Sequence, residues 1–148
     1  MTTSNGSRVI AWDTNCLLAI LSARDENHQQ TKASYDSHHD DRHVISVHSW
    51  LECFSVLTRR PKPWRISPKD AIKTLELSFA HMKIVGLDVA GARAAMRAVQ
   101  DAGFGGGAVY DAAIAQSVAA SGATIFYTWN LRHFTGATSA GLDVRRPG

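Results

Sequence analysis

Three acidic residues stand in stretches that otherwise carry no charge. Asp13 directly follows the apolar run Val9–Trp12, Glu52 is the one charge within Ser49–Leu57, and Asp111 begins an alanine-rich stretch. Carboxylates are almost never fully buried unless they are paired or bind a metal ion. Three carboxylates in one site would need a cation to offset their repulsion, and oxygen ligands without Cys or His favour Mg²⁺ or Mn²⁺.

Each of these acids also has a structural explanation. Asp13 could cap a helix that begins after it, and Asp111 would sit in the first turn of its helix, where the dipole favours a carboxylate. Glu52 shares a helical face with His48 and Arg59, and it could pair with Arg59. Each explanation accounts for one acid, whereas a shared metal site accounts for all three.

Short apolar segments alternate with helical patterns along the chain, which predicts an α/β fold with a parallel sheet covered on both faces. Strands are predicted at Val9–Trp12, His43–Val47, Met82–Val85, Thr124–Thr128 and, as a last edge strand, Leu142–Val144. Helices are predicted at Thr14–Ser22, His28–His38, Ser49–Arg59 with Ser49 as cap, from Pro68 with Ser67 as cap, Asp88–Ala102, and Ala108–Ser121 with Gly122 as C-cap. Ligands of such sheets bind beyond the carboxyl ends of the strands, where Asp13 and Asn130 are expected.

The positive charge is concentrated after residue 58. The 148 residues include 16 Lys and Arg against 13 Asp and Glu, but residues 59–148 hold twelve basic and six acidic residues. Between Arg59 and Lys73, six basic residues accompany a single acid. Such clustering attracts phosphate backbones, and Trp64 within it could stack on a base. The alternative is a solvated surface with Trp64 as a loop anchor.

Composition excludes several classes of protein. With 45% hydrophobic residues and a formal charge of +3, extensive disorder is excluded. Cys16 and Cys53 lie in apolar stretches and are expected to be reduced core thiols. The chain lacks a long apolar run and a hydrophobic leader, so we expect a cytoplasmic protein without a membrane span. Its length predicts a single domain over residues 1–148, with residues 1–7 flexible.

The ordered motifs resemble those of PIN-domain nucleases, in particular the VapC-type toxin ribonucleases of bacterial toxin–antitoxin pairs. The matching segments are Val9–Asn15, Ser49–Glu52, Tyr110–Ala115 and Thr128–Phe134. The resemblance implies a Rossmann-like PIN domain, which is a three-layer α/β/α sandwich around a central parallel sheet.

The same resemblance implies catalytic residues and a substrate. It implies an acidic triad around Mg²⁺ or Mn²⁺ that hydrolyses RNA, with Asn130 in place of a fourth acid that the family often has. The catalytic residues expected on this basis are Asp13, Glu52, Asp111 and Asn130, the first three as metal ligands. The substrate-binding residues expected are Asn15, Arg59, Arg60 and Arg132. His48 and His133 are candidate acid–base helpers, although a histidine near such a site is more often a surface or core residue.

Partners also follow from the resemblance. It implies a cognate VapB-type antitoxin whose tail enters the acidic cleft, and a homodimer. Leu18, Leu21 and Tyr35 are candidate antitoxin contacts, with core packing as the alternative. Three rival functions stay open: a catalytically weak RNA-binding PIN module, a housekeeping PIN nuclease without an antitoxin, and a phosphohydrolase that uses Asp13. The histidines between His38 and His43 could bind a transition metal or form a polar loop.

Overall fold

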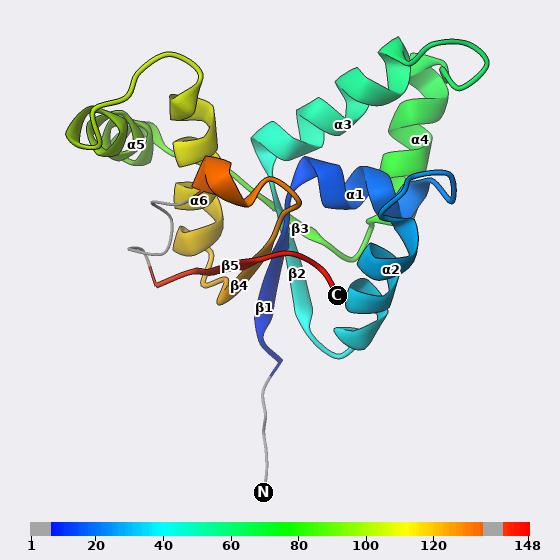
Figure 1. The fold of residues 1–148 in the computed structure, drawn as a ribbon, viewed down its shortest axis with the longest axis horizontal. Coiled ribbons are helices and arrows are strands. Elements are labelled where there is room, and N and C mark those ends of the chain that lie inside the picture. Colours follow the sequence, from blue (N-terminus) through cyan, green and yellow to red (C-terminus); the bar gives the residue numbers. More distant parts are fainter. Residues whose placement is uncertain (1–6, 135–140) are drawn as a thin grey trace, which may run out of the picture.

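Five parallel strands form one sheet in a computed structural model that describes residues 7–134 and 141–148. Their order across the sheet is β3-β2-β1-β4-β5 (Figure 1). The strands are β1 (Val9–Trp12), β2 (Arg42–Ser46), β3 (Lys83–Val85), β4 (Ile125–Tyr127) and β5 (Asp143–Arg145). The helices are α1 (Thr14–Leu21), α2 (His28–Ser37), α3 (Val47–Arg59), α4 (Pro68–Ser78), α5 (Val89–Asp101), α6 (Ala108–Ala120) and the short 3-10 helix η1 (Leu131–Phe134).

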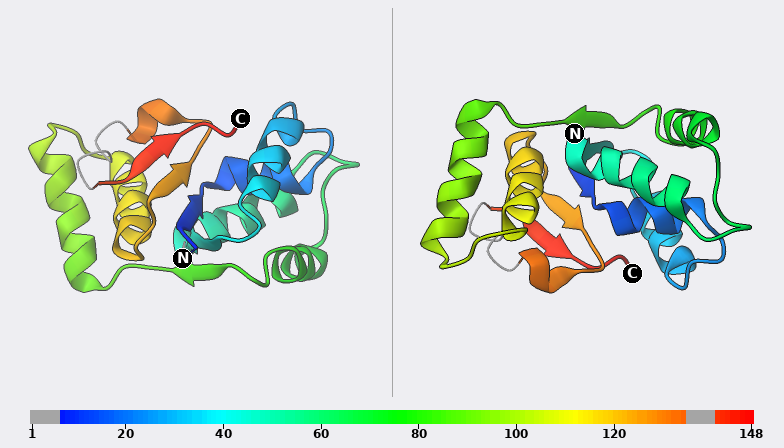
Figure 2. Two further views of the ribbon diagram at one scale, coloured as in Figure 1. Left: turned by 90° about the horizontal axis from the view of Figure 1, so that it is seen from below. Right: turned by 90° about the horizontal axis from the view of Figure 1, so that it is seen from above.

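The helices cover both faces of the sheet, which confirms the predicted three-layer sandwich. Helices α1 to α4 lie on one side and α5 and α6 on the other (Figure 2). Alternate side chains of β1 enter different cores: Ile10 and Trp12 join the first, and Val9 and Ala11 the second. Because both faces are buried, the strand is apolar at every position.

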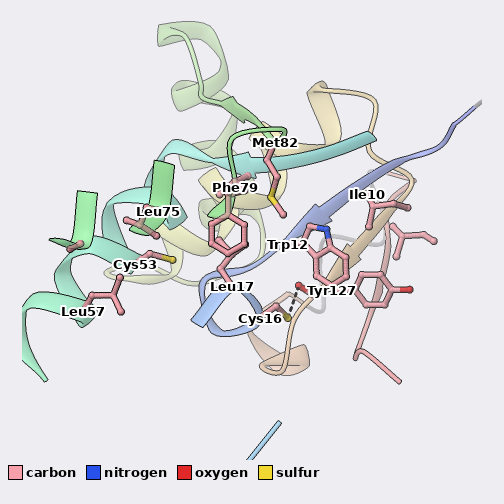
Figure 3. Close-up of a cluster of buried hydrophobic side chains, with 13 residues drawn as sticks. Ile10, Trp12, Cys16, Leu17, Cys53, Leu57, Leu75, Phe79, Met82 and Tyr127 are labelled. Atoms are coloured by element: carbon pink, nitrogen blue, oxygen red, sulfur yellow. Dashed lines mark hydrogen bonds between the residues drawn. The ribbon is translucent and has the colours of Figure 1, made fainter. Parts of the chain in front are cut away.

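The first core contains both cysteines (Figure 3). Cys16 and Cys53 are buried and free, as predicted, and the Cys16 thiol donates to the Tyr127 carbonyl at 3.4 Å. Burial raises the pKa of both thiols, that of Cys53 to about 12. Both therefore stay protonated at neutral pH and pack as small apolar groups.

Most predicted helix ends are confirmed, but the start of α3 is not where the sequence placed it. Ser67 caps α4 with Pro68 in the first turn, and Asp88 caps α5. We expected a strand through Val47 and a cap at Ser49. Instead Ser46 is the cap: its hydroxyl accepts from the Ser49 N–H at 3.0 Å, and Val47 starts the helix. β-Branched residues favour strands mainly when their side chains are packed and buried, whereas Val47 is 43% exposed.

Two further predictions concern chain segments near the ends. Residues 1–6, most of the segment expected to be flexible, lie outside the described residues. The last strand is predicted at Leu142–Val144, and the observed strand β5 is shifted by one residue, to Asp143–Arg145. No helix formed by the described residues is long and apolar enough to cross a membrane.

The polar run between His38 and His43 is part of the fold. His38 is buried, with Nδ1 at 2.7 Å from Asp41 Oδ2 and Nε2 at 2.8 Å from the Tyr127 hydroxyl. His43 accepts from the Trp12 indole N–H at 2.9 Å and lies 3.0 Å from the His38 carbonyl. Within residues 7–134 and 141–148 no cluster is arranged to hold a metal ion, and these histidines are used in internal hydrogen bonds instead.

His43 should make stability pH-dependent. The Trp12 indole only donates, so His43 Nδ1 must be unprotonated and Nε2 carries the proton toward His38. Burial lowers the pKa of His43 below its ordinary value, so the unfolded chain binds this proton more tightly. We expect the free energy of unfolding to fall as pH drops through about 6.5, by at most about 1.4 kcal/mol per pH unit from this group.

The measurement is urea unfolding between pH 7.5 and 5.5. His43→Gln should flatten the slope of stability against pH, whereas His39→Gln, at an exposed histidine, should leave the slope unchanged. Equal slopes in the native chain and in His43→Gln would show that His43 is not the titrating group.

Candidate active site

Asp13 lies where the strand order reverses. The chain runs outward from β1 to β2 and β3, then returns to add β4 on the other side of β1. Asp13 follows β1, its N–H donates to the Tyr127 carbonyl at 3.0 Å, and its carboxylate caps α1. Ligand sites of open α/β sheets form at such a reversal because the adjacent loops diverge there. Although it sits at this edge, Asp13 is only 5% exposed.

Thr128, directly after β4, holds the Asp13 carboxylate by a hydrogen bond. Its hydroxyl donates to Asp13 Oδ2 at 2.8 Å and accepts from the Asn130 N–H at 3.0 Å. Sequence reasoning did not assign Thr128 a role. Its place directly after a buried strand, the same position that Asp13 has after β1, was the signal that could have identified it.

Asn15 joins the same two loops. Its Nδ2 lies 3.4 Å from Asp13 Oδ2, and its Oδ1 accepts from the Trp129 N–H at 3.1 Å. Both ends of the amide are therefore engaged within the protein. Its expected contact with substrate stays a prediction.

Glu52 approaches Asp13 from α3 through a shared neighbour. The Thr14 hydroxyl donates to Glu52 Oε1 at 2.9 Å, and the Thr14 N–H donates to Asp13 Oδ1 at 2.9 Å. His48, one turn earlier on α3, lies with Nε2 at 3.5 Å from Glu52 Oε1. Glu52 thus contacts Thr14 and His48, and the local pairing with Arg59 does not form.

Asp111 enters from the first turn of α6. Its side chain is one-third exposed, and Oδ2 lies 3.8 Å from Nδ1 of His133 in η1. The α6 residues that follow, among them Ile114, Ala115 and Val118, are buried in the second core and fix the helix against the sheet. The dipole at the start of α6 favours a negative charge at this position.

The three carboxylates act on one another electrostatically. Burial raises the pKa of Asp13, the charges of Glu52 and Asp111 raise it further, and the hydrogen bonds from Thr128 and Thr14 oppose the rise. Burial also raises the pKa of Asp111, with His133 opposing and Glu52 adding to the shift. Glu52 on α3 and Asp111 on α6 therefore lie close enough to Asp13, which follows β1, for their charges to raise its pKa.

The chemistry of these donors fits a hard divalent cation. Carboxylate oxygens are the ligands that Mg²⁺ and Mn²⁺ prefer, and a cation would offset both the burial of these charges and the repulsion that adds to the rise of both pKa values. Cys53 follows Glu52 in the chain, but its side chain is buried in the first core, where burial raises the pKa of the thiol to about 12. As the side chains stand, no three acidic, His or Cys side chains among the described residues are placed to hold one ion. Glu52 is turned toward Thr14 and His48.

The predicted substrate contacts lie around this site. Arg132 is exposed in η1, next to the residue that contacts Asp111. Arg59 is exposed at the end of α3, seven residues and about 10 Å of helix beyond Glu52. Arg60 is partly buried and accepts at its carbonyl from Arg65 Nε. None of the three forms an ion pair within the described part of the chain.

Trp64 and Asn130 are both exposed, and both have contacts within the protein. Trp64 is 48% exposed, but the Arg24 guanidinium covers its ring at 3.2 Å from the centroid, which fits the alternative that Trp64 anchors its loop. Asn130 is exposed, and its described contacts are through the backbone, to Thr128 and to the His133 N–H.

The candidate antitoxin contacts Leu18, Leu21 and Tyr35 are partly buried against the first core.

Comparison with known proteins identifies the class of protein. The PIN-domain family model matches residues 10–134, and the chain belongs to that family. It is 31% identical over 117 residues to Ribonuclease VapC40 of Mycobacterium tuberculosis, covering 79% of this chain and 84% of that protein.

Solved structures show the same fold at lower identity. The crystal structure of Mycobacterium tuberculosis VapC20, a sarcin–ricin loop cleaving toxin, has a TM-score of 0.69 at 17% identity, covering 93% of this chain and 99% of that one. VapBC2 from Rickettsia felis, bound to a DNA fragment from its promoter, has a TM-score of 0.66 at 13% identity, covering 95% and 99%. The recognition of a VapC-type PIN domain from sequence motifs is thereby confirmed.

Proposed function

We propose that this protein is a metal-dependent endoribonuclease that acts as the toxin of a toxin–antitoxin pair in the cytoplasm. The observation that supports the proposal is the position of Asp13 at the point where the strand order reverses, with Glu52 joined to it through Thr14 and Asp111 close enough to raise its pKa. Membership of the PIN-domain family and the relationship to a VapC ribonuclease support the reaction class.

The acidic residues would hold one or two Mg²⁺ or Mn²⁺ ions, with Asp13 and Asp111 as direct ligands and Glu52 as a direct or water-mediated one. When bound, such an ion activates a water as the nucleophile and stabilises the charge that develops on the phosphate. Thr128 and Thr14 orient the Asp13 carboxylate, and Thr14 also orients Glu52. Hydrogen bonds of this kind fix a ligand's geometry and are costly to remove.

The basic residues would bind the RNA backbone. Arg132 precedes His133, which contacts Asp111, and Arg59 continues the same face of α3 beyond Glu52. Phosphates held at these two places would lead a single strand across the carboxylates. Asn130 is a candidate to bind a metal-associated water, without contributing charge. The cleavage would leave a 5′-phosphate and a 3′-hydroxyl.

The partner in the proposed pair is a VapB-type antitoxin. The structural neighbour from Rickettsia felis is a VapBC complex with promoter DNA, which supports this assignment. We also propose a homodimer, as the sequence resemblance implies. A housekeeping nuclease with the same site would lack the antitoxin.

The experiment is cleavage of structured cellular RNA by the purified protein. We expect no cleavage in the presence of a chelator and recovery when Mg²⁺ or Mn²⁺ is added back, with 5′-phosphate ends mapped by sequencing. RNA binding without cleavage at any metal concentration would favour the catalytically weak module. A phosphate mimic that forms a covalent adduct at Asp13 would favour the phosphohydrolase.

A further inference from the structure

An aromatic side chain stands exposed beside the carboxylates. Tyr110, in the first turn of α6, directly precedes Asp111 and is 57% exposed. Neither core cluster includes this ring. Tyrosine is enriched at interfaces, where its apolar ring packs on a partner and its hydroxyl stays in contact with water.

The Tyr110 ring is held in place by a histidine from another helix. It stacks on His48 of α3 with ring centroids 5.2 Å apart and planes inclined by 10°. The imidazole therefore covers part of one face of the tyrosine, while the residue stays 57% exposed. Because the ring has only two rotatable bonds and is already stacked, a ligand on the open face would lose little side-chain entropy on binding.

The stacked pair adjoins the catalytic acids on both sides. Tyr110 precedes Asp111 in the chain, and His48 lies 3.5 Å from Glu52. Arg132 and His133 follow on η1, where His133 contacts Asp111. A planar group of a ligand that stacks on Tyr110 would therefore lie next to a phosphate bound at the carboxylates.

We propose that Tyr110, supported by His48, is a stacking platform for an unpaired base of the RNA, at a nucleotide that flanks the scissile phosphate. This rests on the proposed ribonuclease function and names a determinant of its substrate. Every base has a stacking face, so the platform requires a base without reading its identity. A paired duplex offers no free face, so the platform selects single strands and loops.

A structural role for the stack makes a different prediction. If the Tyr110–His48 contact only joins α3 to α6, removing it lowers stability and leaves RNA affinity per folded molecule unchanged. If the ring binds a base, replacement by a non-aromatic residue weakens RNA binding and raises KM, with a smaller effect on kcat.

The first test compares Tyr110→Leu with Tyr110→Phe and with Phe104→Leu. Phe104 is 71% exposed in the loop between α5 and α6, so its variant is a matched loss of an exposed ring. Binding of a labelled single-stranded RNA is measured by anisotropy with chelator present, and each variant's thermal unfolding is recorded. Tyr110→Leu should weaken binding by about 5- to 100-fold, whereas Tyr110→Phe restores it. Equal affinity of the native chain and Tyr110→Leu would overturn the proposal.

The second test uses the substrate. An RNA of known cleavage site is made with an abasic nucleotide at each position around that site. At one flanking position, the abasic substitution should slow cleavage by the native chain about as much as Tyr110→Leu slows cleavage of the intact RNA. The same abasic RNA should be cleaved by Tyr110→Leu at almost the same rate as the intact RNA, because the contact is already lost. Additive effects would contradict a contact between ring and base. If no protein cleaves RNA but Tyr110→Leu still weakens binding, the ribonuclease proposal fails while the platform stands.

Discussion

Asp13→Asn is expected to lower RNA cleavage by more than about a hundredfold while leaving the fold intact. Loss of a residue that only orients a metal ligand typically costs about 10- to 100-fold, and a direct ligand should cost more. The side chain keeps its shape, and Asn is as good a helix cap as Asp, so α1 retains its start. Metal-dependent cleavage at the native rate would remove the proposed mechanism.

The same variant should be more stable than the native chain without metal. The raised pKa of Asp13 means that its ionised form is disfavoured in the folded protein, so ionisation at neutral pH favours unfolding. Asparagine removes that charge, and we expect the metal-free melting temperature to rise by a few degrees. Added Mg²⁺ should stabilise the native chain and not the variant, because only the former binds the ion tightly. Asp36→Asn, at an exposed acid on α2, is the control for both measurements.

Trp12→Ala is expected to lower the free energy of unfolding by at least about 3–5 kcal/mol. Trp12 is fully buried in β1 and stacks on Tyr127, with ring centroids 4.6 Å apart. Its removal leaves a large cavity in the first core and deprives His43 Nδ1 of its donor. An unsatisfied buried acceptor adds about 1–3 kcal/mol, against a total stability of about 5–15 kcal/mol for a typical domain.

Urea unfolding of Trp12→Ala, Trp12→Phe and Trp64→Phe separates these effects. Trp12→Phe keeps most of the packing and loses the N–H, so we expect an intermediate loss. Trp64 is half-exposed beneath Arg24, and its replacement should change stability by less than about 1 kcal/mol. A Trp12→Ala protein as stable as the Trp64→Phe protein would show that the first core does not depend on this ring.

Local sequence patterns were sufficient for most of the fold. Strand β1 appears as an uninterrupted apolar run because both of its faces are buried, and α4 and α5 begin at the caps that their residues indicate. The start of α3 was misplaced by the β-branched Val47, which is exposed and therefore does not extend the strand. The capping contact that places this helix end joins Ser46 to Ser49, three residues apart, but the same residues also fit a strand that continues through Val47.

By itself the sequence determined which acids are unusual, because a lone carboxylate in an apolar segment can be recognised without knowing what surrounds it in the folded protein. It also determined the helical face that places His48 beside Glu52, since that relation is local. Only the tertiary structure decided that Thr128 holds Asp13, that Thr14 connects Asp13 to Glu52, and that Tyr110 stacks on His48. Such contacts join residues from different elements, and their partners are set by strand order and helix packing, which no short segment encodes.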